Sequence, residues 1–181
     1  MVPVYEPGAA EGFEFCHPVR QEDFETLCTT IDGTPRAWTW RSPAMHLIHA
    51  DEGQTLLESD SPWLGAHALI FRRRAALALE PILSGCGELL PLACAEADLV
   101  VFNVTQVLDA LDEAASELTR FSSGRVMLVK RPVFRPEVIA GVDAFKLSSL
   151  RVSPTYVSQR VVEQVRSSGL RGLTFRRVWP E

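Results

Sequence analysis

The sequence predicts an α+β fold, in which a mostly antiparallel, twisted sheet carries two main helices and an irregular N-terminal portion closes one side. Two segments place apolar residues at helical spacing, and five short apolar runs are separated by turn residues, as is typical of strands. The five predicted strands are 88–94, 99–104, 126–131, 144–148 and 172–178. With 181 residues, of which 46% are hydrophobic, the chain can bury one core without disulfides or metal.

The first part of the chain is only weakly periodic and is interrupted by prolines, so we expect short strands and loops there. A short helix is predicted at 21–29, and the spacing of Trp38 and Trp40 predicts a half-exposed strand. We therefore divide the chain into an irregular N-terminal portion, 1–60, which packs on the same domain, and an α+β portion, 61–181.

The first main helix is predicted to begin at Ala66. Its apolar stripe is formed by Phe71, Ala75, Ala78 and Ile82. A proline near the end of this stripe should end or kink the helix, and two glycines beyond it allow the chain to reverse.

The rest of the chain alternates predicted strands with short helices. Apolar residues at helical spacing predict a helix at 105–114, and a hairpin follows it. A single helical turn is predicted at 136–140. The second main helix should begin at Ser158 and end at Gly169, which is a favourable C-terminal stop.

One internal similarity links the two main helices. Residues 70–92 and 156–178 both read as helix, glycine turn and strand. At an offset of 86 positions, apolar residues match as Phe71 with Val157, Ala75 with Val161, Leu79 with Val165, Leu89 with Phe175 and Leu92 with Val178. This pattern leads to the hypothesis of a duplicated unit, which requires the same order of elements in both segments.

The charge of the chain is unevenly distributed. The formal net charge is −5, with −8 in residues 1–60 and +7 in residues 121–181. Either the acidic and basic parts pack side by side and neutralise each other, or the acidic part faces a basic partner. An acidic chain is not expected to bind nucleic acid directly.

No motif of catalysis or metal binding is present. The sequence has no C-x-x-C pair, no G-x-S-x-G elbow and no glycine-rich phosphate loop. His46 and His49 have a metal-ligand spacing if they lie on a helix, but surface or packed histidines are the favoured interpretation. Asp109 and Glu113 would share one face of the predicted helix, where a solvated face is favoured over an acid–base pair. We therefore expect no catalytic residue, metal or cofactor.

The expected location is the cytoplasm. The N-terminal segment has no basic region followed by a long apolar run, so no secretory signal is predicted. No stretch approaches 18 consecutive apolar residues, so no membrane span is predicted. The four unpaired cysteines are consistent with a reducing compartment.

Several strings in the second half of the chain carry a family resemblance. They are Val101-Phe102-Asn103, Leu108-Asp109-Ala110-Leu111-Asp112 with Ser116, Ala144-Phe145-Lys146-Leu147, Tyr156-Val157-Ser158, and Gly169-Leu170-Arg171-Gly172-Leu173-Thr174-Phe175. In these strings and their spacing, residues 64–181 resemble a bacterial family of immunity proteins from polymorphic toxin systems. The family was first catalogued as a domain of unknown function and is named after a myxobacterial member.

The resemblance implies a cytoplasmic, non-catalytic protein that binds and neutralises a cognate toxin domain. Many toxin domains are basic nucleases, and an acidic surface would complement one. We therefore expect the toxin interface on the acidic N-terminal portion. The candidate residues are Asp51, Glu52, Glu58, Asp60 and Trp63.

Two other functions stay open at this point. One is a homo-oligomerising interaction module, which a self-complementary apolar patch would favour. The other is an enzyme whose site is assembled from scattered residues, which a deep pocket holding His46, His49 or a carboxylate pair would favour.

Overall fold

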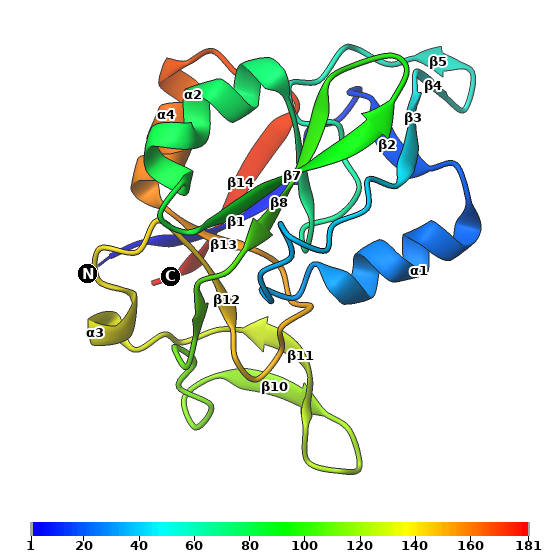
Figure 1. The fold of residues 1–181 in the computed structure, drawn as a ribbon. Coiled ribbons are helices and arrows are strands. Elements are labelled where there is room, and N and C mark those ends of the chain that lie inside the picture. Colours follow the sequence, from blue (N-terminus) through cyan, green and yellow to red (C-terminus); the bar gives the residue numbers. More distant parts are fainter. Residues whose placement is uncertain (1, 181) are drawn as a thin grey trace.

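The computed structural model describes residues 2–180, which form two five-stranded sheets, two short hairpins and four helices (Figure 1). The first sheet has the spatial order β2 (Phe15–Pro18), β3 (Ala44–Ile48), β7 (Gly87–Cys94), β8 (Leu99–Val104), β6 (Leu69–Arg72). The second has the order β14 (Leu173–Trp179), β1 (Val4–Ala9), β13 (Tyr156–Ser158), β12 (Ala144–Leu147), β9 (Val107–Leu108). Most neighbouring strands are antiparallel, so the α+β class is confirmed, with the strands divided between two sheets.

The remaining elements lie around these sheets. The hairpins pair β4 (Ala50–Asp51) with β5 (Gln54–Thr55), and β10 (Glu117–Arg120) with β11 (Val126–Arg131). The helices are α1 (Gln21–Thr30), α2 (Arg73–Leu83), α3 (Pro136–Ile139) and α4 (Gln159–Ser167). Figure 1 shows α2 and α4 side by side above the strands, and the β10–β11 hairpin at the opposite end.

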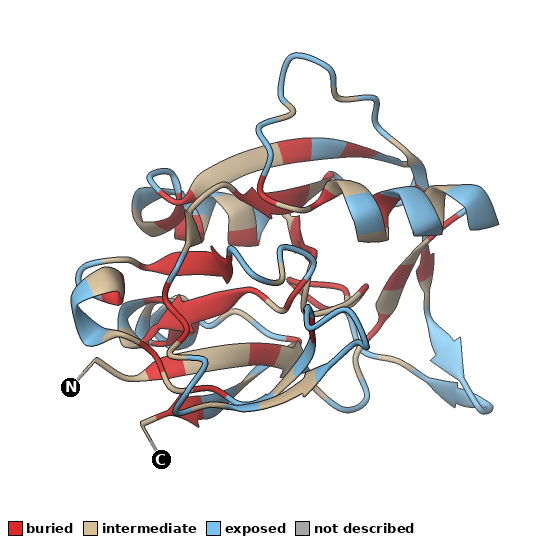
Figure 2. Cartoon of the chain, turned by 90° about the horizontal axis from the view of Figure 1, so that it is seen from below, coloured by how far each residue is buried: buried red, intermediate tan, exposed pale blue. Residues whose placement is uncertain are grey.

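Three apolar clusters form the core. The largest, which we call the central cluster, joins α2 and α4 to the strand faces below them, through residues such as Phe71, Leu79, Phe102 and Val165. A second cluster lies on the other face of the first sheet and is covered by α1. A third lies on the other face of the second sheet, against α3 and the β10–β11 hairpin. Figure 2 shows the buried residues on the central strands and the exposed ones on loops and outer helix turns.

The helical stripes explain why α2 and α4 pack where they do. In α2 the buried residues are Ala75, Leu79 and Leu83, which recur every four positions and therefore share one face. In α4 three buried valines lie within about one turn and share one face, and the helix begins after Ser158 as predicted. The proline expected to end α2 lies two residues before its last residue, where the helix is already ending.

The two segments predicted to be alike have the same order of elements. β6, α2 and β7 follow one another in the first segment, and β13, α4 and β14 in the second. In each unit the two strands flank one antiparallel strand from elsewhere in the chain, which is β8 in the first unit and β1 in the second. The order that the hypothesis requires is confirmed.

The strand registers support the same relationship. In the first unit, Leu89 pairs with Phe102, and the position 86 residues after Leu89, Phe175, pairs with Pro7. On the other flank, Phe71 pairs with Val100, and Val157 pairs with Tyr5. On both flanks, the paired residue of β8 lies 95 positions after the corresponding residue of β1. We call β6–α2–β7 with β8 the first unit, and β13–α4–β14 with β1 the second unit.

The predicted start of the first main helix is wrong. Residues 69–72 form strand β6, and α2 begins at Arg73 instead of Ala66. Phe71 therefore belongs to a strand, where it pairs with Val100 of β8. The helical spacing of Phe71 with later residues arose because strand and helix both bury their apolar side chains in the same cluster.

Two further local predictions are wrong. The segment 105–114 is not a helix, because Val107 and Leu108 pair in parallel with β12 instead. Asp109 and Glu113 therefore share no helix face, and each pairs with its own arginine. Trp38 lies in a turn and not in a strand, and it is 100% exposed.

The N-terminal portion contributes to both sheets. β1 is inserted between β13 and β14, while β2 and β3 extend the first sheet. Because β1 pairs with β14, the two ends of the described chain lie close together (Figure 1). In the described residues, none of the helices is both long and apolar enough to cross a membrane.

Candidate functional site

An acidic groove lies between the end of β1 and the β4–β5 hairpin. Its volume is about 480 Å³. The lining residues are Ala9, Ala10, Glu11, Gly12, Phe15, Asp51, Glu52, Gln54 and Leu56. The three carboxylates come from two segments that are 40 residues apart in the chain, so the fold and not the sequence brings them together. We call this feature the acidic groove.

The hairpin that carries two of these carboxylates has a tight turn. Asp51 pairs with Gln54, which leaves Glu52 and Gly53 as the two turn residues. Both have a positive φ, 46° and 80°, as the twist of a two-residue hairpin requires. Among the described residues, Glu52 is the one non-glycine residue with a positive φ. The turn holds Asp51 and Glu52 exposed at the tip.

Within residues 2–180, the carboxylates of the acidic groove have no cationic partner. Glu11, Asp51 and Glu52 form no ion pair with the described residues. Several acids elsewhere in the N-terminal portion are neutralised, as Glu6 is by Arg176 at 2.6 Å. Unpaired charges of one sign in a concave surface produce a field that attracts a basic partner.

The other predicted interface residues lie elsewhere. Glu58 is exposed beside the groove, since the preceding residue, Leu57, donates its backbone N–H to the carbonyl of Gly12. Asp60 is 8% exposed and is bound by other groups of the chain. Trp63 is half-buried and packs against the largest apolar cluster. The structure thus brings Asp51 and Glu52 together and separates Asp60 and Trp63 from them.

Asp60 joins the two units of the fold. Its carboxylate accepts hydrogen bonds from Arg74 at 3.2 Å and from the backbone N–H of Arg171 at 2.8 Å. The segments approach so closely that a Cβ at Gly172 would lie 1.8 Å from the Ser59 hydroxyl oxygen. Glycine is therefore required at that position, and Asp60 has a structural role.

A chain of charged groups lies beside the acidic groove. The Glu14 carboxylate is buried and accepts hydrogen bonds from Arg72 and from the backbone N–H of Ser59. His49 lies between Glu14, at 3.2 Å, and Glu96, at 2.7 Å. The hydrogen bond to Glu96 raises the pKa of His49 above its ordinary value. These residues link the ends of β2, β3 and β6 to the turn between β7 and β8.

The histidines considered as metal ligands are not a pair. His46 lies in β3 opposite His17, and His49 lies just beyond the strand, so the predicted shared helix face does not exist. Within residues 2–180, no group of three or more histidine, cysteine or acidic side chains could hold a metal ion.

A buried lysine that the sequence pattern did not single out lies between two loops. Lys146 is 0% exposed, and its Nζ donates to the carbonyl oxygens of His67 at 2.8 Å and Ser153 at 3.2 Å. Burial lowers the pKa of Lys146 to about 8. Burial, and then the nearby ammonium group, lower the pKa of His67 to about 4. The apolar residues around Lys146 in the sequence predicted only a strand.

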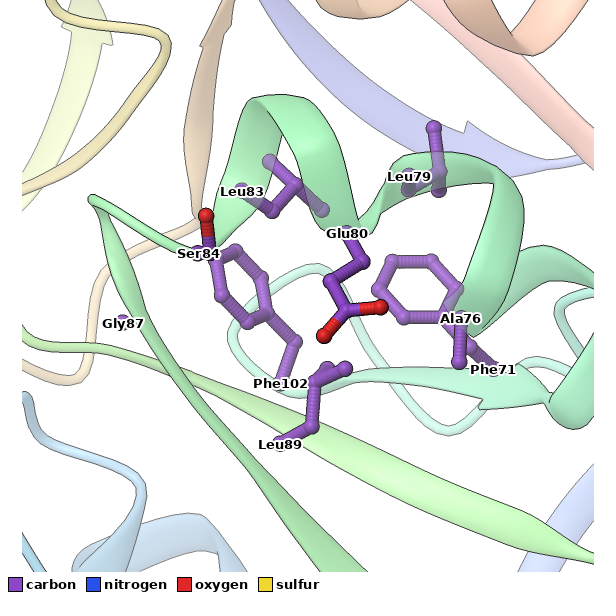
Figure 3. Close-up of a pocket in the computed structure, with 9 residues that line it drawn as sticks. All are labelled: Phe71, Ala76, Leu79, Glu80, Leu83, Ser84, Gly87, Leu89 and Phe102. Carbon is purple, nitrogen blue, oxygen red and sulfur yellow. The ribbon is translucent and has the colours of Figure 1, made fainter.

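A second concave feature, mostly apolar, lies along α2. It is a pocket of about 190 Å³ between the helix and strands β7 and β8. Figure 3 shows the Glu80 side chain lying among Phe71, Phe102 and Leu89, which line the pocket. Glu80 makes no ion pair or side-chain hydrogen bond with the described residues.

Comparison with known proteins shows that the second half of the chain is similar to one protein family. Residues 95–179 match the model of an immunity protein family (Imm11). The match begins just before β8 and ends with β14, so the predicted resemblance is confirmed over this part of the chain. The comparison with curated proteins finds no match. The acidic groove lies outside the matched segment.

Proposed function

We propose that this protein is a non-catalytic immunity protein that binds and neutralises the toxin domain of a cognate polymorphic toxin. The observation that carries the proposal is the match of residues 95–179 to an immunity protein family. The matched segment supplies the central strand of the first unit and most of the second unit, so it forms a large part of the folded core. In a bacterial cell, the expected site of action is the cytoplasm.

The acidic groove is the proposed contact for the toxin. It offers three carboxylates that form no ion pair with the described residues, on a surface that the fold does not use for its own packing. Complementary potentials accelerate association and disfavour partners of the wrong charge. A basic toxin domain is the partner that this groove would select.

The position of the groove supports a role in partner choice. Its residues belong to the part of the chain before residue 95, while the matched segment carries the shared core. Backbone hydrogen bonds such as that from Ala10 N–H to the carbonyl of Gly172 attach the groove to that core. In this arrangement the shared segment provides the scaffold, and the N-terminal portion provides specificity for one toxin.

Co-expression with the toxin domain encoded beside this protein tests the proposal. The toxin domain alone should stop growth of a bacterial host, and co-expression of this protein should restore it. The purified pair should form a stoichiometric complex in size-exclusion chromatography. A folded protein that neither restores growth nor binds the toxin domain would contradict the proposal.

A further inference from the structure

His49 lies at the base of the hairpin that carries part of the acidic groove. It follows β3 directly and precedes β4. Its backbone carbonyl accepts a hydrogen bond from the N–H of Leu56, at 2.8 Å, and this bond closes the base of the β4–β5 hairpin. Leu56 also lines the acidic groove. A group that fixes His49 therefore helps to fix the hairpin on which Asp51 and Glu52 lie.

Both ring nitrogens of His49 face carboxylate oxygens. Nε2 lies 2.7 Å from Oε2 of Glu96, and Nδ1 lies 3.2 Å from Oε2 of Glu14. An ionised carboxylate accepts hydrogen bonds and cannot donate them, whereas a neutral imidazole has one N–H and one lone pair. In the neutral ring, one nitrogen would turn its lone pair toward an anion. The arrangement therefore fits the imidazolium ion, which carries a proton on both nitrogens.

The two carboxylates are held in place by other groups of the first sheet. Oε1 of Glu14 accepts hydrogen bonds from Arg72 of β6 and from a backbone N–H, and this side chain is 2% exposed. Oε1 of Glu96, in the turn between β7 and β8, accepts one from the N–H of Leu47 in β3, at 3.0 Å. In each carboxylate one oxygen is thus fixed and the other is directed at the half-exposed ring of His49.

The charged groups around His49 favour its protonated form. Glu14 approaches the ring from the segment before β2, and Glu96 approaches it from the β7–β8 turn. No other acid of the described residues lies within ion-pair distance of the ring. The cations nearby are Arg72, which binds Glu14, and His46 of β3, which lies near Glu96. Contact with two anions stabilises the imidazolium ion.

We propose that His49 is a proton-dependent clamp: its protonated ring joins Glu14 to Glu96 and holds the base of the β4–β5 hairpin, and loss of the proton releases one of the two carboxylates. Backbone hydrogen bonds between Leu57 and residues 12–14 remain in the released state. Release therefore loosens the hairpin and the acidic groove without unfolding the sheet. The clamp does not depend on toxin binding, and only its consequence for the toxin rests on the proposed function.

The direction of the pH dependence follows from the contacts of His49. The hydrogen bond to Glu96, and then the charges of Glu96 and Glu14, raise the pKa of His49 above its ordinary value of 6.5. The folded chain thus binds this proton more tightly than the unfolded chain does. The stabilisation by His49 is complete below pH 6.5 and is lost as the pH rises through the pKa of the folded state. Acid therefore closes the clamp.

An NMR titration of the protein without any partner tests the clamp. The ring nitrogen shifts of His49 should show both nitrogens protonated at pH 6 and a pKa above 6.5. The hydrogen-exchange protection factor of the Leu56 amide should fall about threefold across this titration, as expected for loss of a partly exposed ion pair. The amide of Val101, which is 0% exposed in the centre of β8, reports on global opening and should keep its protection.

Glu96→Gln separates the contact from the proton. The amide oxygen of glutamine can still accept from Leu47, while its NH₂ group can donate to a neutral imidazole. The pKa of His49 should therefore fall, and protection of the Leu56 amide should no longer depend on pH. Asp98→Asn is the matched control, because Asp98 is an exposed acid of the same turn that forms no ion pair with the described residues. It should leave both quantities unchanged.

Three results would overturn the proposal. The first is a His49 pKa at or below 6.5, and the second is an equal effect of Glu96→Gln and Asp98→Asn. The third comes from His49→Ala, which should lower protection of the Leu56 amide at pH 6 and remove its pH dependence; a retained pH dependence would assign the effect to another group. A confirmed clamp in a protein that binds no toxin domain would contradict the proposed function alone.

Discussion

Gln164 donates a hydrogen bond to the carbonyl oxygen of Ala78, at 3.0 Å, and these two residues are counterparts in the two units of the fold. They are 86 positions apart, which is the offset at which the apolar residues of the two segments match and with which the strand registers agree. A contact between a residue and its own counterpart is expected where two like units meet about an approximate two-fold axis. The helices α2 and α4 thus meet at equivalent points, and the central cluster forms beneath them.

Removing a side chain from this central cluster should destabilise the protein. Leu79 is 1% exposed and packs between the two units. Leu79→Ala is expected to lower the free energy of unfolding by about 2–5 kcal/mol, measured by urea denaturation. Leu77→Ala on the same helix, where the side chain is 59% exposed, should change it by less than about 0.5 kcal/mol. Equal effects of the two variants would contradict the described packing.

Charge reversal in the acidic groove should slow binding of the toxin domain. The triple variant Glu11→Lys, Asp51→Lys, Glu52→Lys should lower the association rate about tenfold at low salt, because attraction becomes repulsion. Stopped-flow or surface plasmon resonance measurements at several salt concentrations would detect this. Reversal of Glu25, Glu137 and Glu163, which are also exposed, is the matched control and should have little effect. An unchanged rate and salt dependence in the triple variant would remove the groove from the interface.

Asp60 and Glu58 should behave differently although both were predicted at the interface. Asp60→Asn weakens the bonds to Arg74 and Arg171 in a buried place and should lower the free energy of unfolding by about 1–3 kcal/mol. Glu58→Gln changes an exposed group and should leave stability within about 0.5 kcal/mol. Thermal and urea unfolding of both variants would test this, and a stable Asp60→Asn protein would contradict its structural role.

His67 should make the fold sensitive to acid. Its pKa is about 4 in the folded chain, below the ordinary value of 6.5, so between these values only the unfolded chain binds the proton. Its contribution to stability is therefore undiminished above pH 6.5 and declines as the pH falls toward 4. Urea unfolding at pH 7 and pH 4.5 should show a larger loss for the natural protein than for His67→Gln. Identical losses would exclude this origin of the pH dependence.

Local patterns predicted many elements correctly because those elements depend on neighbouring residues. The valine stripe of α4 and the cap at Ser158 lie within one helix, and β10 and β11 are joined by a short turn. The strand at 126–131 matches its predicted bounds. The order of elements in the two units was also predictable, since the offset of 86 is visible in the positions of apolar residues.

Two of the wrong assignments involve pairing between distant segments. Phe71 has an apolar, helix-compatible spacing, but pairing with Val100 places it in a strand. Val107 and Leu108 likewise pair with β12, almost 40 residues later in the chain. A strand gains its hydrogen bonds from another segment, so periodicity alone cannot distinguish it from a helix that buries the same face.

The sequence by itself determined the fold class, the helical stripe of α4, the likeness of the two units and the excess of acid in the N-terminal portion. Only the tertiary structure decided which acids are free. It gathers Glu11 with Asp51 and Glu52 in an open groove, while it buries Asp60 against Arg74 and Arg171. It also leaves the flank of α2 open. The physical reason is that exposure and pairing of a side chain depend on segments far away in the chain, which packing brings together and local sequence does not encode.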